Sequence, residues 1–443
     1  MILPELLRDF FAPFAFAFTE PTHRRFVLLA LGAVLCTGRR TVANILRTLG
    51  PLAPGDPSAY RRILCRAPWP ALALGCALAR MTLARWQPEG PVILVGDETV
   101  DRHKGKKVHG KARHRDPCRS SRTYTAFAYG HKWVVLAVLV RLPGATRPWA
   151  LPVFIDLYRS AEQNRLRRRP HRTPAELMAR LLRLWLMRMP GRAVFVGDGA
   201  YGTHPLARFC RRHRRRLSLV SKLHPAANLH RPPPSYSGKG RPRVKGAKLP
   251  SPEQAVAGAK LRRCRVGWYG GGTRVVRTAG GTGHWHKSGK GLAHLRWVFV
   301  RDVTGTHRDE YFFSTDPGMS VRRIIGLYTG RWNIETTFEE SRAHLGLGTT
   351  RGYGEKTVLR AAPCLLGLYT AVALLYDGLP ERSKGVTIRW EGKAGVTFSD
   401  ALSRVRRWLW DEGVLTHPDA KGGVSKLPEP IREVLLTTLA PAA

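Results

Sequence analysis

The sequence is poor in acidic residues. Among its 443 residues only 31 are Asp or Glu, against 74 Lys and Arg, which gives a formal net charge of +43. So positive a chain repels itself unless a polyanion neutralises it, and DNA or RNA is therefore the expected partner. A coding bias towards Arg would explain the choice of Arg over Lys, but not the scarcity of acids.

The chain also lacks paired cysteines and long apolar runs. None of its seven cysteines forms a CxxC pair, which argues against a zinc ribbon or a disulfide framework and for reduced thiols in a cytoplasm. The longest apolar run, FVLLALGAVLC at 26–36, is too short to cross a bilayer and predicts a buried helix. We expect a cytoplasmic protein without a membrane partner.

The chain begins with helical patterns. Residues 1–88 alternate apolar helical stretches with Gly and Pro breakers, which predicts an all-helical N-terminal domain. Two of its segments, GRRTVANILR and SAYRRIL, suit either a helix-turn-helix-like DNA contact or a plain bundle with Arg on its solvent face. We assign this domain to DNA binding and leave the two forms open.

From residue 91 the pattern becomes that of strands. PVILVGD at 91–97 predicts a buried strand ending at Asp97, and further strands follow, two of them joined near Gly130. A capped helix, TPAELMARLLRLWLMRM, and a second buried strand ending at Asp198 come next. This order predicts the α/β fold class, with a mixed central sheet flanked by helices.

The second half of the chain divides into three parts. Residues 225–294 are basic and rich in Gly and Pro, and the strand-like stretches among them predict a β-rich insertion. We expect this insertion to interrupt the sheet domain, which occupies 89–224 and resumes at 295–380. A helical tail is expected at 381–443, where RRWLW at 406–410 marks a DNA-binding or dimer-forming helix.

Two buried strands end in a carboxylate, at Asp97 and Asp198. An acid at the end of one strand is commonplace, but acids at the ends of neighbouring strands can converge on divalent cations, and their hard oxygen ligands suit Mg²⁺ or Mn²⁺. Adjacent strand residues point to opposite faces, so Asp97 or Glu98 can be the first ligand; we choose Asp97, which ends the apolar run. Asp101 and Asp156 are expected at the surface.

A third acid comes from YTGRWNIETTFEESR at 328–342. At about 100° per residue, four side chains fall within one helical stripe of about 60°: Tyr328, Arg331, Glu335 and Arg342. The aromatic and aliphatic residues around this stripe predict a half-buried Glu335, and flanking Arg side chains stabilise its anion, the form that a metal needs. Glu339 and Glu340 are expected to be ordinary helix charges.

This spacing resembles the Tyr-x2-Arg-x3-Glu-x6-Lys signature of DDE transposases of bacterial insertion sequences, the cut-and-paste group with a β-rich insertion. Three of the four positions match; Arg342 replaces Lys, which keeps the charge but changes the grip on a phosphate. VGDETVDRHKGKKVHG and VFVGDGAYG resemble the family's blocks for the first and second aspartates. The resemblance spans roughly 20–375 and implies an RNase H-like catalytic core, in which Tyr328 either hydrogen-bonds a DNA phosphate or simply packs.

The resemblance implies a catalytic triad of Asp97, Asp198 and Glu335 that holds two Mg²⁺ or Mn²⁺ ions about 4 Å apart. Such a site would cut double-stranded DNA at the terminal inverted repeats of a transposon and join the freed ends to target DNA, within a homodimer at the bacterial nucleoid. Arg331 and Arg342 would contact phosphates near the scissile bond. Two alternatives stay open: an RNase H-like nuclease without strand transfer, and a catalytically inactive, transposase-derived DNA-binding protein.

Two further segments are candidate DNA contacts. DRHKGKKVHGKARHRD at 101–116, with Lys104, Lys106 and Lys107, is expected to follow a DNA backbone. Its histidines do not indicate zinc, because no Cys or carboxylate partners stand at ligand spacing. Trp285, in GHWHKSGKG, can stack on an unpaired base or lie in a disordered basic loop.

Overall fold

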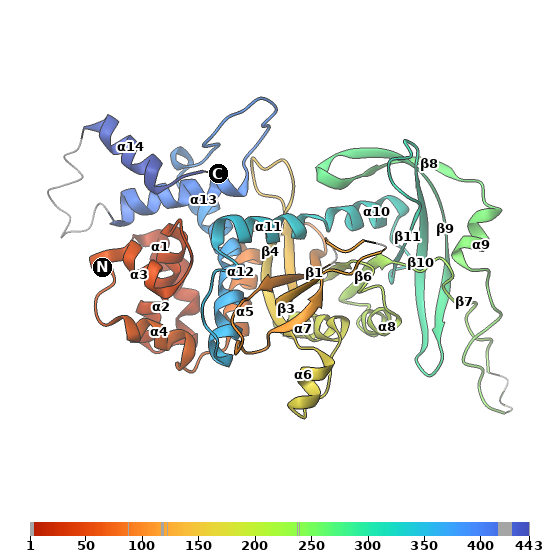
Figure 1. Ribbon diagram of the computed structural model, residues 1–443. Coiled ribbons are helices and arrows are strands. Elements are labelled where there is room, and N and C mark those ends of the chain that lie inside the picture. Colours follow the sequence, from red (N-terminus) through yellow and green to blue (C-terminus); the bar gives the residue numbers. More distant parts are fainter. Residues whose placement is uncertain are drawn as a thin grey trace.

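The computed structural model in Figure 1 places helices at one end of the molecule, a long sheet through its middle and a strand-rich part at the other end. The structure describes residues 4–86, 88–116, 119–121, 123–236, 238, 240–414 and 428–442. The C-terminal helices lie beside the N-terminal ones, so the two ends of the chain pack on the same side of the sheet domain.

The N-terminal part is all-helical, as predicted. Its helices are α1 (Glu5–Phe11), α2 (Glu20–Leu35), α3 (Val42–Leu49), α4 (Pro57–Cys65) and α5 (Ala71–Arg85). The apolar run expected to form a buried helix is the second half of α2, and Gly32 in it lets α3 approach closely, because a Cβ there would lie 2.7 Å from Cγ2 of Ile45. Helices α3 and α4 follow one another across a short turn; a DNA contact by them stays a prediction.

The centre of the molecule is a mixed sheet with the strand order β4–β3–β1–β5–β6. Neighbours β4, β3 and β1 are antiparallel, whereas β1, β5 and β6 are parallel. This is the arrangement of the RNase H-like core that the sequence predicted. The strands are β1 (Val92–Arg102), β2 (Ala112–Arg115), β3 (Phe127–Val140), β4 (Trp149–Tyr158), β5 (Ala193–Gly197) and β6 (Leu217–Lys222).

Two strands are longer than predicted. Strand β1 does not end at Asp97 but continues to Arg102, because β3 pairs with it along that whole stretch. Strand β3 is one continuous strand, so the expected junction of two strands near Gly130 is wrong. Gly130 is needed there for a different reason: a Cβ at that position would lie 2.0 Å from the backbone oxygen of Asp101 on β1.

The insertion is β-rich and extends the central sheet instead of forming a separate one. Beyond β6 the strand order continues β11–β10–β9–β7, with β8 also paired to β9. Strand β10 crosses the expected boundary at residue 294. The elements are β7 (Leu229–His230), α9 (Pro252–Ala257), β8 (Arg262–Gly267), β9 (Thr273–Lys287), β10 (Gly291–Asp302) and β11 (Glu310–Ser314).

Helices cover both faces of the sheet. One face carries α5, α7 (Pro174–Arg188) and α8 (His204–Arg212), and the other carries α10 (Val321–Gly330) and α11 (Asn333–Leu345). The remaining helices are α6 (Ala161–Leu166), α12 (Glu355–Gly378), α13 (Phe398–Trp408) and α14 (Glu429–Leu439). Among the described residues α12 alone has the length and apolar composition of a membrane span, but 78% of its most apolar stretch is buried inside the protein.

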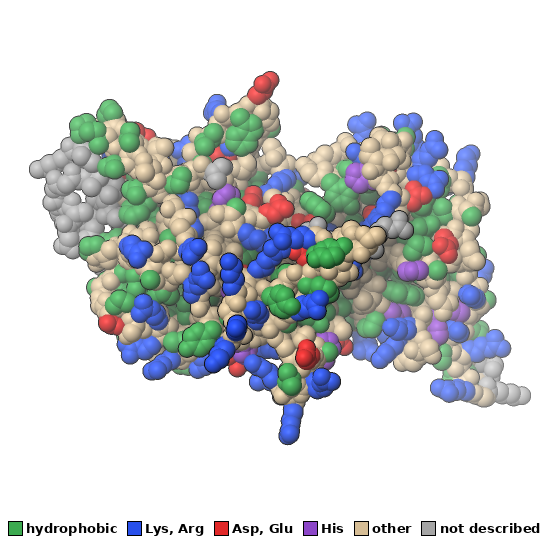
Figure 2. Space-filling model, viewed as in Figure 1, with side chains coloured by type: hydrophobic (Ala, Val, Ile, Leu, Met, Phe, Trp, Pro, Cys, Tyr) green, Lys and Arg blue, Asp and Glu red, His purple; other side chains and the backbone are tan. Residues whose placement is uncertain are grey.

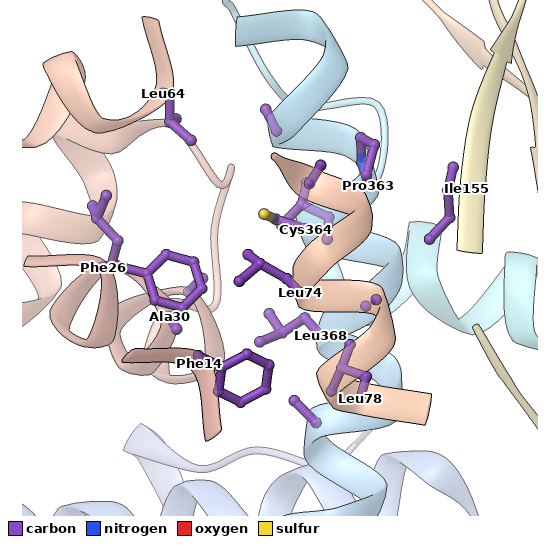
Figure 3. A pocket seen from close by; sticks show the side chains of 18 of the residues that line it. Phe14, Phe26, Ala30, Leu64, Leu74, Leu78, Ile155, Pro363, Cys364 and Leu368 are labelled. Carbon is purple, nitrogen blue, oxygen red and sulfur yellow. The ribbon is translucent and has the colours of Figure 1, made fainter. Parts of the chain in front are cut away.

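The N-terminal helices meet the core across an apolar cavity of about 150 Å³. Figure 3 shows Phe14, Phe26 and Ala30 on one side of this cavity and Leu74 of α5 and Leu368 of α12 on the other. The apolar residues that line this cavity belong to the hydrophobic core between the N-terminal helices and the sheet domain.

The C-terminal helix α13 is docked on the N-terminal part through Arg406. This side chain is 5% exposed, and its Nε donates a hydrogen bond of 2.7 Å to the backbone oxygen of Val34. The expectation that RRWLW marks a DNA-binding helix is therefore wrong for Arg406, because its guanidinium satisfies the carbonyl end of α2 inside the protein.

Candidate active site

Strand β1 presents its two acidic residues to opposite faces of the sheet. Asp97 faces α10 and α11 and accepts a hydrogen bond from Arg331. Glu98 points to the other face, where it pairs with Lys132 and accepts a 3.3 Å hydrogen bond from the hydroxyl of Tyr201. The strand alternation that left two candidates for the first acid thus places Asp97 on the side of Glu335.

Asp198 lies beside Asp97 because their strands are parallel neighbours. Gly96 of β1 is in register with Gly197 of β5, and each aspartate is the next residue along. Oδ1 of Asp198 accepts a 2.9 Å hydrogen bond from the backbone N–H of Ala200, and Ser221 on β6 donates to its backbone oxygen at 2.6 Å. The turn after β5 therefore holds Asp198 in place directly after the strand and beside Asp97. This is the position that the sequence predicted for Asp198.

Glu335 lies in the first turn of α11, and the helix before it is not continuous. Helix α10 ends at Gly330, and the N–H groups of Ile334 and Glu335 bond the carbonyls three residues earlier, at 3.0 Å each. Arg331 and Trp332 nevertheless keep right-handed helical backbone angles, so the predicted stripe persists: Arg331 bonds Glu335 one turn later and lies over the ring of Tyr328, and Arg342 reaches Thr99 on β1. Arg331 is buried, the Glu335 side chain is 33% exposed, and Arg342 lies at the surface.

Arg331 joins two of the three acids. Its guanidinium donates to Asp97 and, at 3.1 Å, to Oε1 of Glu335, while the residue is only 6% exposed. The prediction that it contacts DNA phosphates is not what this geometry shows, because the group points inward. Its charge instead compensates carboxylates that burial would otherwise disfavour.

The pKa shifts of Asp97 and Glu335 reflect burial and electrostatic repulsion among the three carboxylates. Burial raises the pKa of Asp97 to about 7; Arg331 opposes this rise, and the charges of Asp198 and Glu335 add to it. Burial likewise raises the pKa of Glu335, against the effect of Arg331. Repulsion of this kind is what a divalent cation relieves, and an all-carboxylate donor set suits Mg²⁺ or Mn²⁺. Their oxygen atoms are not all within 4.8 Å of one another in the described part of the chain, and Arg331 lies between Asp97 and Glu335.

The predicted DNA contacts fall into two groups. Lys104, Lys106 and Lys107 are exposed in the loop that follows β1, and Figure 2 shows Lys and Arg side chains scattered over most of the visible face. Arg342, also exposed, donates a hydrogen bond to the hydroxyl of Thr99 on β1. These four residues remain placed to meet a DNA backbone.

The two aromatic candidates are packed instead. Tyr328 is 3% exposed and its ring stacks on Phe312 at 4.2 Å, so of the two roles left open for it, packing is the one its surroundings show. Trp285 lies in the paired strand β9, edge-on to Phe313, and its backbone oxygen bonds His204 at 3.0 Å. A disordered loop is wrong here, because the β9–β10 hairpin orders this segment, whereas base stacking by Trp285 stays a prediction.

Sequence reasoning misjudged three acids. Glu340 is not an ordinary helix charge: Arg147 donates to it at 3.0 Å and the hydroxyl of Tyr369 at 2.7 Å. Asp156 pairs with Arg180 at the edge of α7. Asp101, expected at the surface, is 2% exposed.

Sequence reasoning also passed over an exposed aromatic. Trp332 is 49% exposed in the turn between α10 and α11, next to Arg331.

Comparison with known protein families matches residues 13–275 to a family described as DDE superfamily endonuclease. The matched segment contains Asp97 and Asp198 and ends before Glu335. A search of curated proteins finds none that matches. Among solved structures, the chain is similar to the piggyBac transposase synaptic complex with hairpin DNA, determined by cryo-EM, at 10% sequence identity and a TM-score of 0.39, covering 99% of this chain and 83% of that one.

Proposed function

The chain belongs to the DDE superfamily of endonucleases, and on this premise we propose that it is a transposase that cleaves DNA at transposon ends and transfers the cut strand to target DNA. The observation that carries the proposal is that three acids from distant parts of the chain, Asp97, Asp198 and Glu335, approach one another on one face of the RNase H-like sheet. Beyond the effect of burial, the charges of Asp198 and Glu335 raise the pKa of Asp97, and the charge of Asp198 raises that of Glu335.

The three carboxylates would hold two Mg²⁺ or Mn²⁺ ions. Such a pair, when bound, activates the attacking oxygen and stabilises the leaving oxygen of a phosphodiester. The protein's own part is to fix the ligands: β1 and β5 set the two aspartates side by side, and the first turn of α11 places Glu335 on the other side of Arg331. Arg331 opposes the effect of burial on Asp97 and Glu335 and so favours their ionised form, which is the form that binds a cation.

DNA would approach from the exposed side of this site. Lys104, Lys106 and Lys107 lie in a loop that leaves the same strand as Asp97, and Arg342 leaves the same helix as Glu335. Contacts of these side chains with phosphates would hold the duplex with its scissile bond near the carboxylates. The basic surface supports double-stranded DNA as partner; that a homodimer binds both the transposon ends and the target is part of the proposal.

The test uses DNA carrying the inverted repeats that flank the gene. Glu335→Gln should bind this DNA within about twofold of wild type and lose Mg²⁺-dependent cleavage by about 10³-fold, because one charged ligand is lost while the shape is kept; that loss equals roughly 4 kcal/mol of barrier. Glu339→Gln, an exposed position one turn later on the same helix, is the matched control and should cleave normally. Full cleavage by Glu335→Gln would remove Glu335 from the site.

A second assay separates transposase from nuclease. Pre-cut ends with a free 3′-OH are mixed with supercoiled plasmid and Mg²⁺, and joined products are counted. Joining supports strand transfer. Cleavage of the flanked DNA without any joining would identify an RNase H-like nuclease, and specific binding without cleavage by wild type would identify a catalytically inactive DNA-binding protein.

A further inference from the structure

A second cluster of potential ligands lies farther along the same strand as Asp97. Asp101 of β1 is the cross-strand partner of His131 on β3, and His103 follows just after β1 ends. One ligand atom from each of these three residues lies within 4.8 Å of the others. At about 3.3 Å per residue, the cluster is roughly 13 Å from Asp97, so it is separate from the candidate active site.

The cluster is sealed from solvent. Asp101 and His131 are 2% and 1% exposed, and the His103 side chain is 8% exposed. A small cavity of about 10 Å³ adjoins both histidines and is closed by Thr350, Gly352 and the first two turns of α12. A volume of roughly 10–15 Å³ holds one water molecule.

The hydrogen bonds leave two buried acceptors unsatisfied. Nε2 of His131 lies 2.8 Å from the backbone oxygen of His109, which can only accept, so Nε2 carries the proton and Nδ1 presents a lone pair. Nδ1 of His131 and Oδ1 of Asp101 have no hydrogen-bond partner among the described residues. Two unpaired acceptors sealed from bulk solvent are costly, and a cation bound by both would satisfy them.

The arrangement around His131 is also that of a metal ligand. Histidines that bind metals commonly donate their second N–H to a backbone carbonyl or a carboxylate, which fixes the ring and its tautomer. Oδ2 of Asp101 lies 3.1 Å from Nε2 of His103, so these two atoms share a proton that a cation would replace. Two imidazoles and one carboxylate favour Zn²⁺ over Mg²⁺, which prefers an all-oxygen shell.

We propose that Asp101, His103 and His131 bind one Zn²⁺ ion, with a water molecule in the adjoining cavity as the fourth ligand. The site ties together the end of β1, the start of β3 and the loop 103–111. The N–H of His109 in that loop also bonds the backbone oxygen of Tyr353 at 2.8 Å, just before α12. The ion thus has a structural role: it holds in place the loop that carries Lys104, Lys106 and Lys107.

The test measures metal content, which does not depend on whether the protein cleaves DNA. Full-length protein is stripped with a chelator, reconstituted with Zn²⁺ in the presence of excess Mg²⁺, desalted and analysed for zinc. Wild type should retain one equivalent per chain, and Asp101→Asn and His131→Gln should each retain less than about a tenth of that. Asp198→Asn, which alters only the separate carboxylate site, is the control and should retain the full equivalent.

Titration of stripped wild type with Co²⁺ keeps the proposal testable if the variants fail to fold. Cobalt in a four-coordinate site of two imidazoles and a carboxylate should give intense visible absorption that saturates at one equivalent and disappears on addition of Zn²⁺. Wild type that retains no zinc and shows no such absorption would overturn the proposal. So would folded Asp101→Asn and His131→Gln variants, judged by circular dichroism, that retain as much zinc as wild type.

Discussion

Two clusters of ionisable side chains, one around Asp97 and one around Asp101, lie at one face of β1, and they balance their charges in different ways. At Asp97 the protein supplies its own cation, because Arg331 reaches between two of the three carboxylates. At Asp101 the neighbours are histidines, and one carboxylate oxygen and one ring nitrogen have no partner in the described structure. The first cluster has an internal counter-ion, whereas the second lacks one.

The two clusters also differ in their exposure to solvent. The Glu335 side chain is 33% exposed, so the first cluster is open to a phosphate and to exchanging ions. Asp101 and His131 are sealed beneath the start of α12. A site that is open to solvent can admit a substrate and exchange its metal ions. A closed site with fixed ligands suits a permanently bound structural ion. We therefore propose that the same strand carries a reactive end at Asp97 and an anchored end at Asp101, and each of the following changes tests that division.

The largest expected effect is on cleavage. Asp198→Asn should lower Mg²⁺-dependent cleavage of end DNA by about 10³-fold or more, whereas His103→Asn should lower it by less than about tenfold, because His103 lies far from the reacting phosphate. The measurement is the single-turnover rate at saturating DNA. If His103→Asn proved as damaging as Asp198→Asn, the two clusters would be one functional unit and the division would fail.

Removing the internal counter-ion should cost stability. Arg331→Met leaves the partly buried carboxylates of Asp97 and Glu335 without their shared counter-ion and should lower the free energy of unfolding by about 1–3 kcal/mol in EDTA. Mg²⁺ should restore more stability to this variant than to wild type. Arg322→Met, at an exposed position on α10, is the control and should change the unfolding free energy by less than about 0.5 kcal/mol. Equal losses in both variants, measured by urea unfolding, would show that Arg331 does not neutralise the site.

The raised pKa of Asp97 makes stability depend on pH. Its value of about 7 in the folded protein exceeds the ordinary 3.8, so the folded state binds the extra proton and stability falls as pH rises from about 4 to about 7. Asp97→Asn cannot ionise and escapes this fall. Relative to wild type in EDTA, the variant should therefore gain about 2–3 kcal/mol between pH 5 and pH 8. A difference that stays constant with pH would mean that Asp97 is already ionised at pH 5.

The sequence allowed the approach of Asp97 and Asp198 to be predicted, but not that of Asp101 and His131. The apolar runs before Asp97 and Asp198 are local signals of buried strands, and parallel pairing then brings their ends together. Asp101 was missed because DETVDR, read alone, looks like a loop; β1 continues through it only because β3 pairs there. His131 is thirty residues away, so its pairing with Asp101 is a matter of strand register, which no local pattern reveals.

The partner of Arg331 was equally non-local. The helical wheel placed Arg331 beside Glu335, but its inward hydrogen bond to Asp97 depends on β1, which lies far away in the sequence. Trp285 was placed in a loop because GHWHKSGKG is rich in Gly and Lys, whereas pairing with β10 holds it in a strand. In each case a contact distant in the sequence overrode the local preference.

The smallest expected effect concerns the loop above the anchored end. Changing Lys104, Lys106 and Lys107 together to Gln should weaken DNA binding and reduce the slope of log affinity against log salt by up to about 2.7, because each phosphate contact contributes about 0.9. If the Asp101 cluster holds this loop in place, Asp101→Asn should reproduce part of the reduction although it removes no lysine. Asp198→Asn should leave the slope unchanged. A slope that responds to the lysines but not to Asp101 would show that the loop meets DNA without being held from below.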